Sequence, residues 1–126
     1  MHIIPPLPTR PVVLIADDEP AIADTLALIL QKNGFDSIAT YSGDAAFAAA
    51  QAKRPDALVV DMVMIGMNGM ETALRIRAFY PGCRIILISG GGATRDLLAE
   101  AGSMGEDVEL LAKPFAPGEL LAKLRA

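Results

Sequence analysis

The sequence predicts an α/β fold: a doubly wound, parallel, five-stranded sheet with helices on both faces. Three observations support this prediction. Short apolar runs recur along the chain, helical patterns alternate with them, and the connections between them are short. At 126 residues the chain has the size of one domain, without an internal repeat or linker.

The expected strands are apolar runs rich in Val, Ile and Leu. Runs of this kind are typical of parallel strands that are covered on both faces. A short, more polar strand is expected between the first two apolar runs. The predicted strands cover residues 12–16, 37–41, 57–60, 84–88 and 108–112.

The expected helices begin and end at recognisable residues. Pro20 suits the first turn of a helix, and Gly34 suits its end. Ser42 can cap a second helix that runs to about residue 53. Three further helices are predicted over residues 69–80, 94–101 and from about 117. The last helix would turn three leucines towards the sheet: Leu120, Leu121 and Leu124.

The composition excludes several classes of protein. A net charge of -4 without a basic run argues against autonomous nucleic-acid binding. Cys83 is the single cysteine, so neither a disulfide framework nor a cysteine metal site is expected. No apolar stretch reaches the roughly 18 residues of a membrane span. Residues 1–10 form an irregular, proline-rich leader without signal-peptide features, so residues 11–126 are expected to form a cytoplasmic domain.

Chemically active side chains follow the predicted strands. Asp17 and Asp18 follow the first strand, Asp61 ends the run at 57–60, Ser89 ends the run at 84–88, and Lys113 follows the last. Ligands of open α/β sheets bind in the crevice at the carboxyl ends of the strands. Three acids, one hydroxyl and one ammonium at this edge predict a site for a hard cation and a phosphoryl group.

The acidic cluster favours a magnesium site. Clustered carboxylates repel one another and raise each other's pKa unless a cation lies among them, and hard oxygen ligands suit Mg²⁺. The structural alternative is that Asp17 and Asp18 merely complement the dipole at the start of a helix. Asp61 has no such explanation, because no helix is expected to begin there. Together the three acids favour the metal site.

Lys113 and Ser89 each have a phosphoryl interpretation and an ordinary one. Lys113 can hold a phosphoryl oxygen as a point charge, and a cis bond to Pro114 would turn its ammonium towards the site. An exposed, solvated lysine is the alternative. The Ser89 hydroxyl and the Gly90 main-chain N–H can donate to phosphoryl oxygens. The alternative for the glycines at 90–92 is a flexible loop.

Taken in order, the strand-end motifs resemble the receiver domain of two-component response regulators along residues 11–125. The resemblance implies a flavodoxin-like fold with strand order 2-1-3-4-5, in which the site lies at the switch point between the first and third strands. The motifs are Ala16-Asp17-Asp18-Glu19-Pro20, Val59-Val60-Asp61-Met62, Gly66-Met67-Asn68-Gly69, Ile88-Ser89-Gly90 and Ala112-Lys113-Pro114-Phe115.

The resemblance also implies a role for each site residue. Asp61 would accept a phosphoryl group from the phosphohistidine of a histidine kinase or phosphotransfer protein. Mg²⁺ would be bound by Asp18, Asp61 and the Val63 carbonyl, with Asp17 acting through water. The phosphoryl oxygens would be held by Lys113, Ser89 and the main-chain amides of Met62, Val63 and Gly90. Such a protein is a signalling phosphoacceptor rather than a turnover enzyme, and acts on a protein partner as a monomer or a phosphorylation-dependent homodimer.

The chain departs from the usual receiver pattern at two positions. Ile65 stands where a proline is usual, four residues after the acceptor, and Leu110 stands where an aromatic residue usually turns inward on phosphorylation. The usual aromatic switch therefore cannot be assigned. Val63 and Gly91, at positions flanking the phosphoryl group, offer no side chain to position a water. We therefore expect no fast self-dephosphorylation.

Three other functions compete with this interpretation. A degenerate receiver that acts only as a docking module is the main alternative, favoured by Leu110 and Ile65. An aspartate-based phosphatase of the dehalogenase-like class needs a second Asp where this chain has Val63, and carries its nucleophile on the first strand. A dinucleotide site is rejected, because the turn at residues 16–20 lacks glycine and its acids would repel pyrophosphate.

Overall fold

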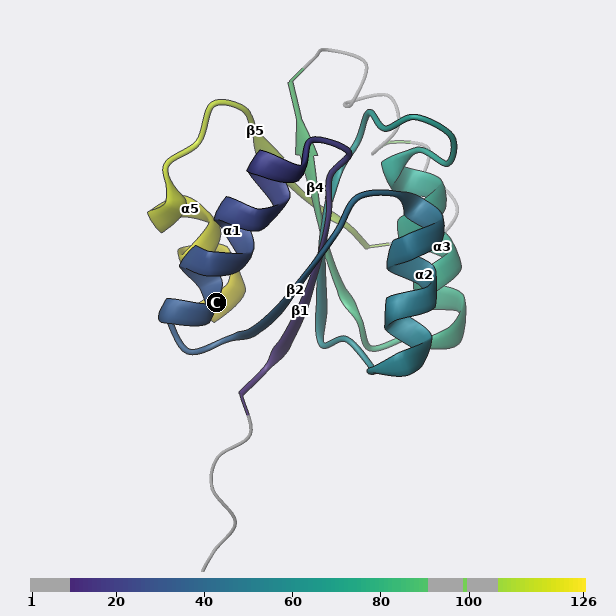
Figure 1. Cartoon of the computed structure of the whole chain (residues 1–126), viewed down its shortest axis with the longest axis horizontal. Coiled ribbons are helices and arrows are strands. Elements are labelled where there is room, and N and C mark those ends of the chain that lie inside the picture. The colour runs from purple at the N-terminus through teal and green to yellow at the C-terminus, as the bar shows by residue number, and fades with distance from the viewer. Residues whose placement is uncertain (1–9, 91–98, 100–106) are drawn as a thin grey trace, which may run out of the picture.

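The computed structural model of the chain describes residues 10–90, 99 and 107–126. Five parallel strands form one sheet in the order β2-β1-β3-β4-β5 (Figure 1). The strands are β1 (Val12–Ala16), β2 (Asp36–Thr40), β3 (Ala57–Asp61), β4 (Arg84–Ser89) and β5 (Glu109–Ala112). The helices are α1 (Pro20–Lys32), α2 (Gly43–Ala52), α3 (Gly69–Phe79) and α5 (Pro117–Arg125). The predicted fold class and strand order are confirmed.

The sheet separates two hydrophobic cores. Figure 1 shows α1 and α5 on one face and α2 and α3 on the other. Side chains alternate along β1, so that Leu14 belongs to the core under α2 and α3, while Val13 and Ile15 belong to the core under α1 and α5. Both faces of the central strands are therefore buried, as the continuous apolar runs indicated.

The predicted boundaries agree closely with the observed ones. Asp36 begins β2 one residue earlier than predicted, and its N–H donates to the Pro11 carbonyl at 2.8 Å. Gly34 has a φ of 95°, a conformation that glycine adopts at low cost, and α1 ends just before it. The Ser42 hydroxyl accepts from the Ala45 N–H at 3.0 Å, which is the predicted cap of α2.

The C-terminal helix packs as predicted. Leu120 is fully buried, and Leu121 and Leu124 are partly buried in the same core. Apart from residue 99, the helix predicted over residues 94–101 lies outside the described residues, as do residues 1–9 of the predicted leader. None of the helices described is long and apolar enough to cross a membrane.

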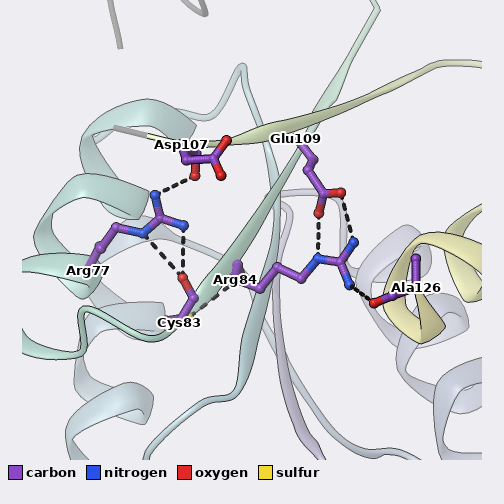
Figure 2. A network of polar contacts seen from close by, with 6 residues as sticks. All are labelled: Arg77, Cys83, Arg84, Asp107, Glu109 and Ala126. Atoms are coloured by element: carbon purple, nitrogen blue, oxygen red, sulfur yellow. Dashed lines mark hydrogen bonds and ion pairs between the residues drawn. The ribbon is translucent and has the colours of Figure 1, made fainter. Parts of the chain in front are cut away.

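The amino ends of β4 and β5 are joined by arginine side chains. Arg84 forms a two-point ion pair with Glu109, at 2.5 and 2.7 Å, and also donates to the Ala126 carbonyl at 3.1 Å (Figure 2). Arg77 of α3 donates to the Cys83 and Asp107 carbonyls. These contacts lie at the end of the sheet opposite the predicted site. They stabilise the fold and do not involve the carboxyl ends of the strands, where the site is expected.

Candidate functional site

The strand register brings the predicted side chains to one edge of the sheet. Ala16 lies beside Val60, so Asp17 and Asp61 follow at neighbouring strand ends. In the same way Ser89 pairs with Ala112, directly before Lys113. The carboxyl ends of these strands lie at the upper edge of the sheet in Figure 1. The sequence-based grouping of these residues at one edge therefore agrees with the structure.

Three carboxylates form a compact cluster at this edge. One oxygen from each of Asp17, Asp18 and Asp61 lies within 4.8 Å of the other two. Asp17 is 1% exposed and Asp61 is 8% exposed, while Asp18 is half-buried. Three carboxylates this close, two of them buried, repel one another, and a bound cation would relieve this repulsion.

Asp17 gives the clearest sign that a cation fits. Its Oδ1 accepts from the Glu19 N–H at 2.9 Å, but its buried Oδ2 has no hydrogen-bond partner among the described residues. Burial raises the pKa of the Asp17 carboxyl, and the nearby Asp61 and Asp18 carboxylates raise it further. The Glu19 N–H and the Lys113 ammonium lower this pKa, but they do not cancel the effect of burial. A buried, unpartnered carboxylate oxygen beside two other acids suits a hard cation.

The helix-capping alternative for these acids does not fit the geometry. Glu19 is the N-cap residue of α1 and makes no side-chain capping bond, and the first turn of the helix holds no acid. Asp17 accepts a hydrogen bond only from Glu19, which precedes the helix, within the described part of the chain. Among the described residues, neither Asp17 nor Asp18 therefore accepts a hydrogen bond from the first turn of α1, whereas one oxygen of each lies within 4.8 Å of the other and of Asp61.

Lys113 lies against the acidic cluster. Its Nζ is 3.2 Å from Oδ2 of Asp61, and the side chain is about one-third exposed. The Lys113 N–H donates to the Ser89 carbonyl at 2.7 Å, and the bond to Pro114 is cis. A Cβ added at Gly90 would lie 4.0 Å from Cδ of Lys113, so Gly90 borders the aliphatic part of this side chain. The ammonium is thus placed beside Asp61, as the phosphoryl interpretation requires, and is not a freely solvated lysine.

The loop between β3 and α3 holds the cluster with main-chain donors. The Val63 N–H donates to Oδ1 of Asp61 at 3.3 Å, and the Ile65 N–H donates to Oδ2 of Asp18 at 3.1 Å. The side chains of both residues point into solvent, with exposed fractions of 79% for Val63 and 87% for Ile65. Sequence reasoning missed the Ile65 donor, because a main-chain contact leaves no trace in side-chain identity.

Gly69 permits α3 to begin directly against the site. A Cβ at this position would lie 2.3 Å from the Asp61 carbonyl oxygen and 2.8 Å from the Met62 Cα. The Gly69 N–H donates to the Met62 carbonyl at 3.0 Å, which closes the loop. The sequence indicated Gly69 only as the first residue of the helix predicted over residues 69–80. The structure instead gives Gly69 a packing role next to the phosphoacceptor candidate.

The remaining predicted residues have different positions. Ser89 is buried at the end of β4, and Gly90 follows it at the surface. The Met62 N–H donates to the Ile88 carbonyl at 2.9 Å, continuing the pairing of β3 with β4. This amide therefore already donates within the sheet, whereas a donor for a phosphoryl oxygen should point out of the sheet towards the site. Leu110 packs, partly buried, against the core under α2 and α3, and Gly91 lies outside the described residues.

Comparisons with known proteins agree with this geometry. Residues 13–125 match the family described as the response regulator receiver domain. The chain resembles the solved structure of the chemotaxis protein CheY4 of Vibrio cholerae, with a TM-score of 0.82 and 27% identity over 93% of this chain and 98% of that one. It is also similar to a two-component transcriptional regulator of Clostridium phytofermentans, with a TM-score of 0.80 and 29% identity over 91% of this chain and 90% of that one.

Curated relatives include longer bacterial regulators. The probable transcriptional regulatory protein TcrX of Mycobacterium tuberculosis is 32% identical over 90% of this chain and 48% of its own length. The DNA-binding response regulator MtrA of Mycolicibacterium smegmatis is 33% identical over 90% of this chain and 49% of its own length. The chain thus spans about half the length of the curated relatives it matches. Because residues 13–125 match the family model and the fold and strand-end acids agree with it, the chain belongs to the receiver domain family of two-component response regulators.

Proposed function

We propose that Asp61 accepts a phosphoryl group from the phosphohistidine of a histidine kinase or phosphotransfer protein, in a Mg²⁺-dependent reaction. The observation that carries this proposal is the position of the Asp61 carboxylate. It is nearly buried, lies 3.2 Å from the Lys113 ammonium, and shares a cluster with the unpartnered Oδ2 of Asp17. A nucleophilic oxygen next to a fixed positive charge suits transfer of a group whose oxygens are negative.

The transfer needs little more than positioning. A carboxylate oxygen of Asp61 attacks the phosphorus, a new O–P bond forms, and the N–P bond of the phosphohistidine breaks. The departing imidazole nitrogen keeps the electron pair and takes a proton from water. The product is an acyl phosphate on Asp61, a covalent strategy open to carboxylates.

Several groups of this chain would hold the phosphoryl oxygens. Lys113 already contacts Asp61, and its ammonium would move from the free carboxylate to the transferred group. The Ser89 hydroxyl and the main-chain amides of Val63 and Gly90 would donate hydrogen bonds. The amide of Met62 does not belong to this set, because it is bonded to the Ile88 carbonyl.

The acidic cluster would hold the cation. Asp18, Asp61 and the Val63 carbonyl would bind Mg²⁺ directly, with Asp17 acting through a bound water. When bound, the cation supplies positive charge that stabilises the phosphoryl oxygens during transfer. Its binding is supported by the all-oxygen donor set and by the buried, unpartnered Oδ2 of Asp17.

The acyl phosphate would act as a signal. The exposed, apolar Val63 side chain cannot orient a water for hydrolysis, so we propose a slowly hydrolysing phosphoprotein rather than a turnover enzyme. The phosphoryl group would change the contacts of the segment from Ser89 to Leu111, of which the structure describes residues 89–90, 99 and 107–111, and hence the protein partner bound there. With a net charge of -4, the domain itself would contact protein rather than nucleic acid, in the cytoplasm, as a monomer or a phosphorylation-dependent homodimer.

The experiment that tests this function uses a small acyl-phosphate donor. The protein is incubated with the donor and Mg²⁺, and its intact mass is measured with and without a chelator. We expect the mass of one phosphoryl group to be added, only in the presence of Mg²⁺ and not to Asp61→Asn. Asp44→Asn, an exposed carboxylate in the first turn of α2, is the matched control and should still be phosphorylated.

The docking-module alternative predicts a different result. In that case the folded wild type would gain no phosphoryl group from the donor, nor from histidine kinases supplied with ATP. This outcome would overturn the proposed phosphoacceptor function and leave the protein-binding role.

A further inference from the structure

We propose that the main-chain N–H of Ile65 is a positioning group for the cation, holding the Asp18 carboxylate in the orientation that binds Mg²⁺. The inference rests on the proposed function, because it assumes a cation among the three acids. It goes further by assigning part of the affinity to the β3–α3 loop, which lies outside the acidic cluster.

The three acids are not held equally. Asp17 is buried and accepts from Glu19, and Asp61 is nearly buried and contacts both Val63 and Lys113. Asp18 is half-buried, and within the described residues its side chain has one hydrogen bond, from the Ile65 N–H at 3.1 Å. Asp17 also has one hydrogen bond among the described residues, but it is held by burial as well, so the orientation of Asp18 depends most on its single contact.

Without this contact, repulsion would turn Asp18 away from the cluster. Two other carboxylates have an oxygen within 4.8 Å of one of its own, and solvent is accessible on its open side. The Ile65 N–H opposes this movement. A hydrogen bond to an ionised acceptor is among the stronger ones, and a main-chain donor fixed in a loop loses little freedom in making it.

The N–H and the cation do not compete for the same electron pair. An ionised carboxylate offers two oxygens and about four acceptor sites, so a hydrogen bond at Oδ2 leaves others for a metal. Groups that orient a ligand in this way from outside the coordination shell commonly change metal affinity by about 10- to 100-fold when they are removed. We therefore expect the contact to strengthen cation binding.

The side chain and the N–H of Ile65 can be tested separately. The side chain is 87% exposed, so Ile65→Ala removes almost no packing and keeps the donor. Ile65→Pro removes the donor, because proline has no N–H. The two variants form a matched pair in which only one loses the contact with Asp18.

The first measurement is the dissociation constant for Mg²⁺, from NMR titration of the Val63 and Gly90 amide signals. The chain has no tryptophan, so indole fluorescence is no option. We expect Ile65→Ala to bind as the wild type does and Ile65→Pro to bind roughly 10-fold more weakly. Equal or tighter binding by Ile65→Pro would overturn the inference. A wild type that binds no Mg²⁺ would instead refute the proposed metal site itself.

A second measurement needs no variant. Proline also restricts the conformation of the preceding residue, Met64, which is buried, so Ile65→Pro could disturb the loop. Hydrogen exchange of the Ile65 amide in the wild type avoids this problem. We expect the amide to be at least as protected with saturating Mg²⁺ as without it. Faster exchange in the presence of Mg²⁺ would mean that the cation displaces the N–H, which would overturn the inference.

Discussion

Gly69→Ala should destabilise the protein through a clash directly beneath the phosphoacceptor. The added Cβ would lie 2.3 Å from the Asp61 carbonyl oxygen and 2.8 Å from the Met62 Cα, and both are main-chain atoms that no rotamer change can move. Either the start of α3 or the end of β3 must shift. Overpacking of this kind costs about 1–3 kcal/mol. For a domain of this size, each kcal/mol corresponds to a loss of about 4 °C in Tm.

The matched control is the same substitution at Gly118. This glycine lies in the first turn of α5, and a Cβ there would meet nothing within 4 Å. Alanine favours a helix over glycine by roughly 0.5–1 kcal/mol, so Gly118→Ala should leave the free energy of unfolding unchanged or raise it. Urea denaturation of both variants measures the difference. If Gly69→Ala were as stable as the wild type, the close approach of α3 to the Asp61 main chain would be refuted.

Three further predictions concern charged and titratable groups. Lys113→Ala should slow phosphorylation by a small acyl-phosphate donor. It should also strengthen Mg²⁺ binding, because it removes a positive charge 3.2 Å from the Asp61 carboxylate. Weaker Mg²⁺ binding on NMR titration would contradict this account. Burial raises the pKa of the Cys83 thiol to about 11, so Ellman's reagent at pH 8 should label this thiol only when the protein unfolds. The free energy of unfolding should fall as the pH rises from 9.0 towards 11, because the thiol ionises more readily in the unfolded chain. Rapid labelling of the folded protein would contradict this prediction. Arg84 lowers the pKa of the Glu109 carboxyl, so the stability that this pair adds is present above pH 4.5 and is lost as the pH falls below it. The free energy of unfolding should therefore depend less on pH in this acid range for Glu109→Gln than for the wild type. Identical pH dependence of the two proteins would show that the pair adds nothing.

The fold and the strand-end residues were predictable because both follow from local patterns. Continuous apolar runs indicated buried parallel strands, and the carboxyl ends of such strands share an edge. Asp17 and Asp61 could therefore be grouped from the sequence alone. The position of Lys113 followed from the same reasoning, although the cis bond to Pro114 did not, since both isomers of such a bond are accessible.

The main-chain contacts of the site were not predictable. The Ile65 N–H on Asp18 and the Met62 N–H on Ile88 depend on the path of a loop, and every residue except proline offers the same donor. The packing of Gly69 against Asp61 depends on how closely a helix approaches a strand end, which no local pattern encodes.

The most direct test of the central claim is to locate the phosphoryl group on the chain. After phosphorylation in the presence of Mg²⁺, borohydride reduces an acyl phosphate on aspartate to homoserine, which peptide mass spectrometry can identify. We expect homoserine at position 61 and unmodified aspartate at positions 17 and 18. Homoserine at either of those positions, or none in a folded protein that has bound Mg²⁺ and received the donor, would contradict the assignment of Asp61 as the phosphoacceptor.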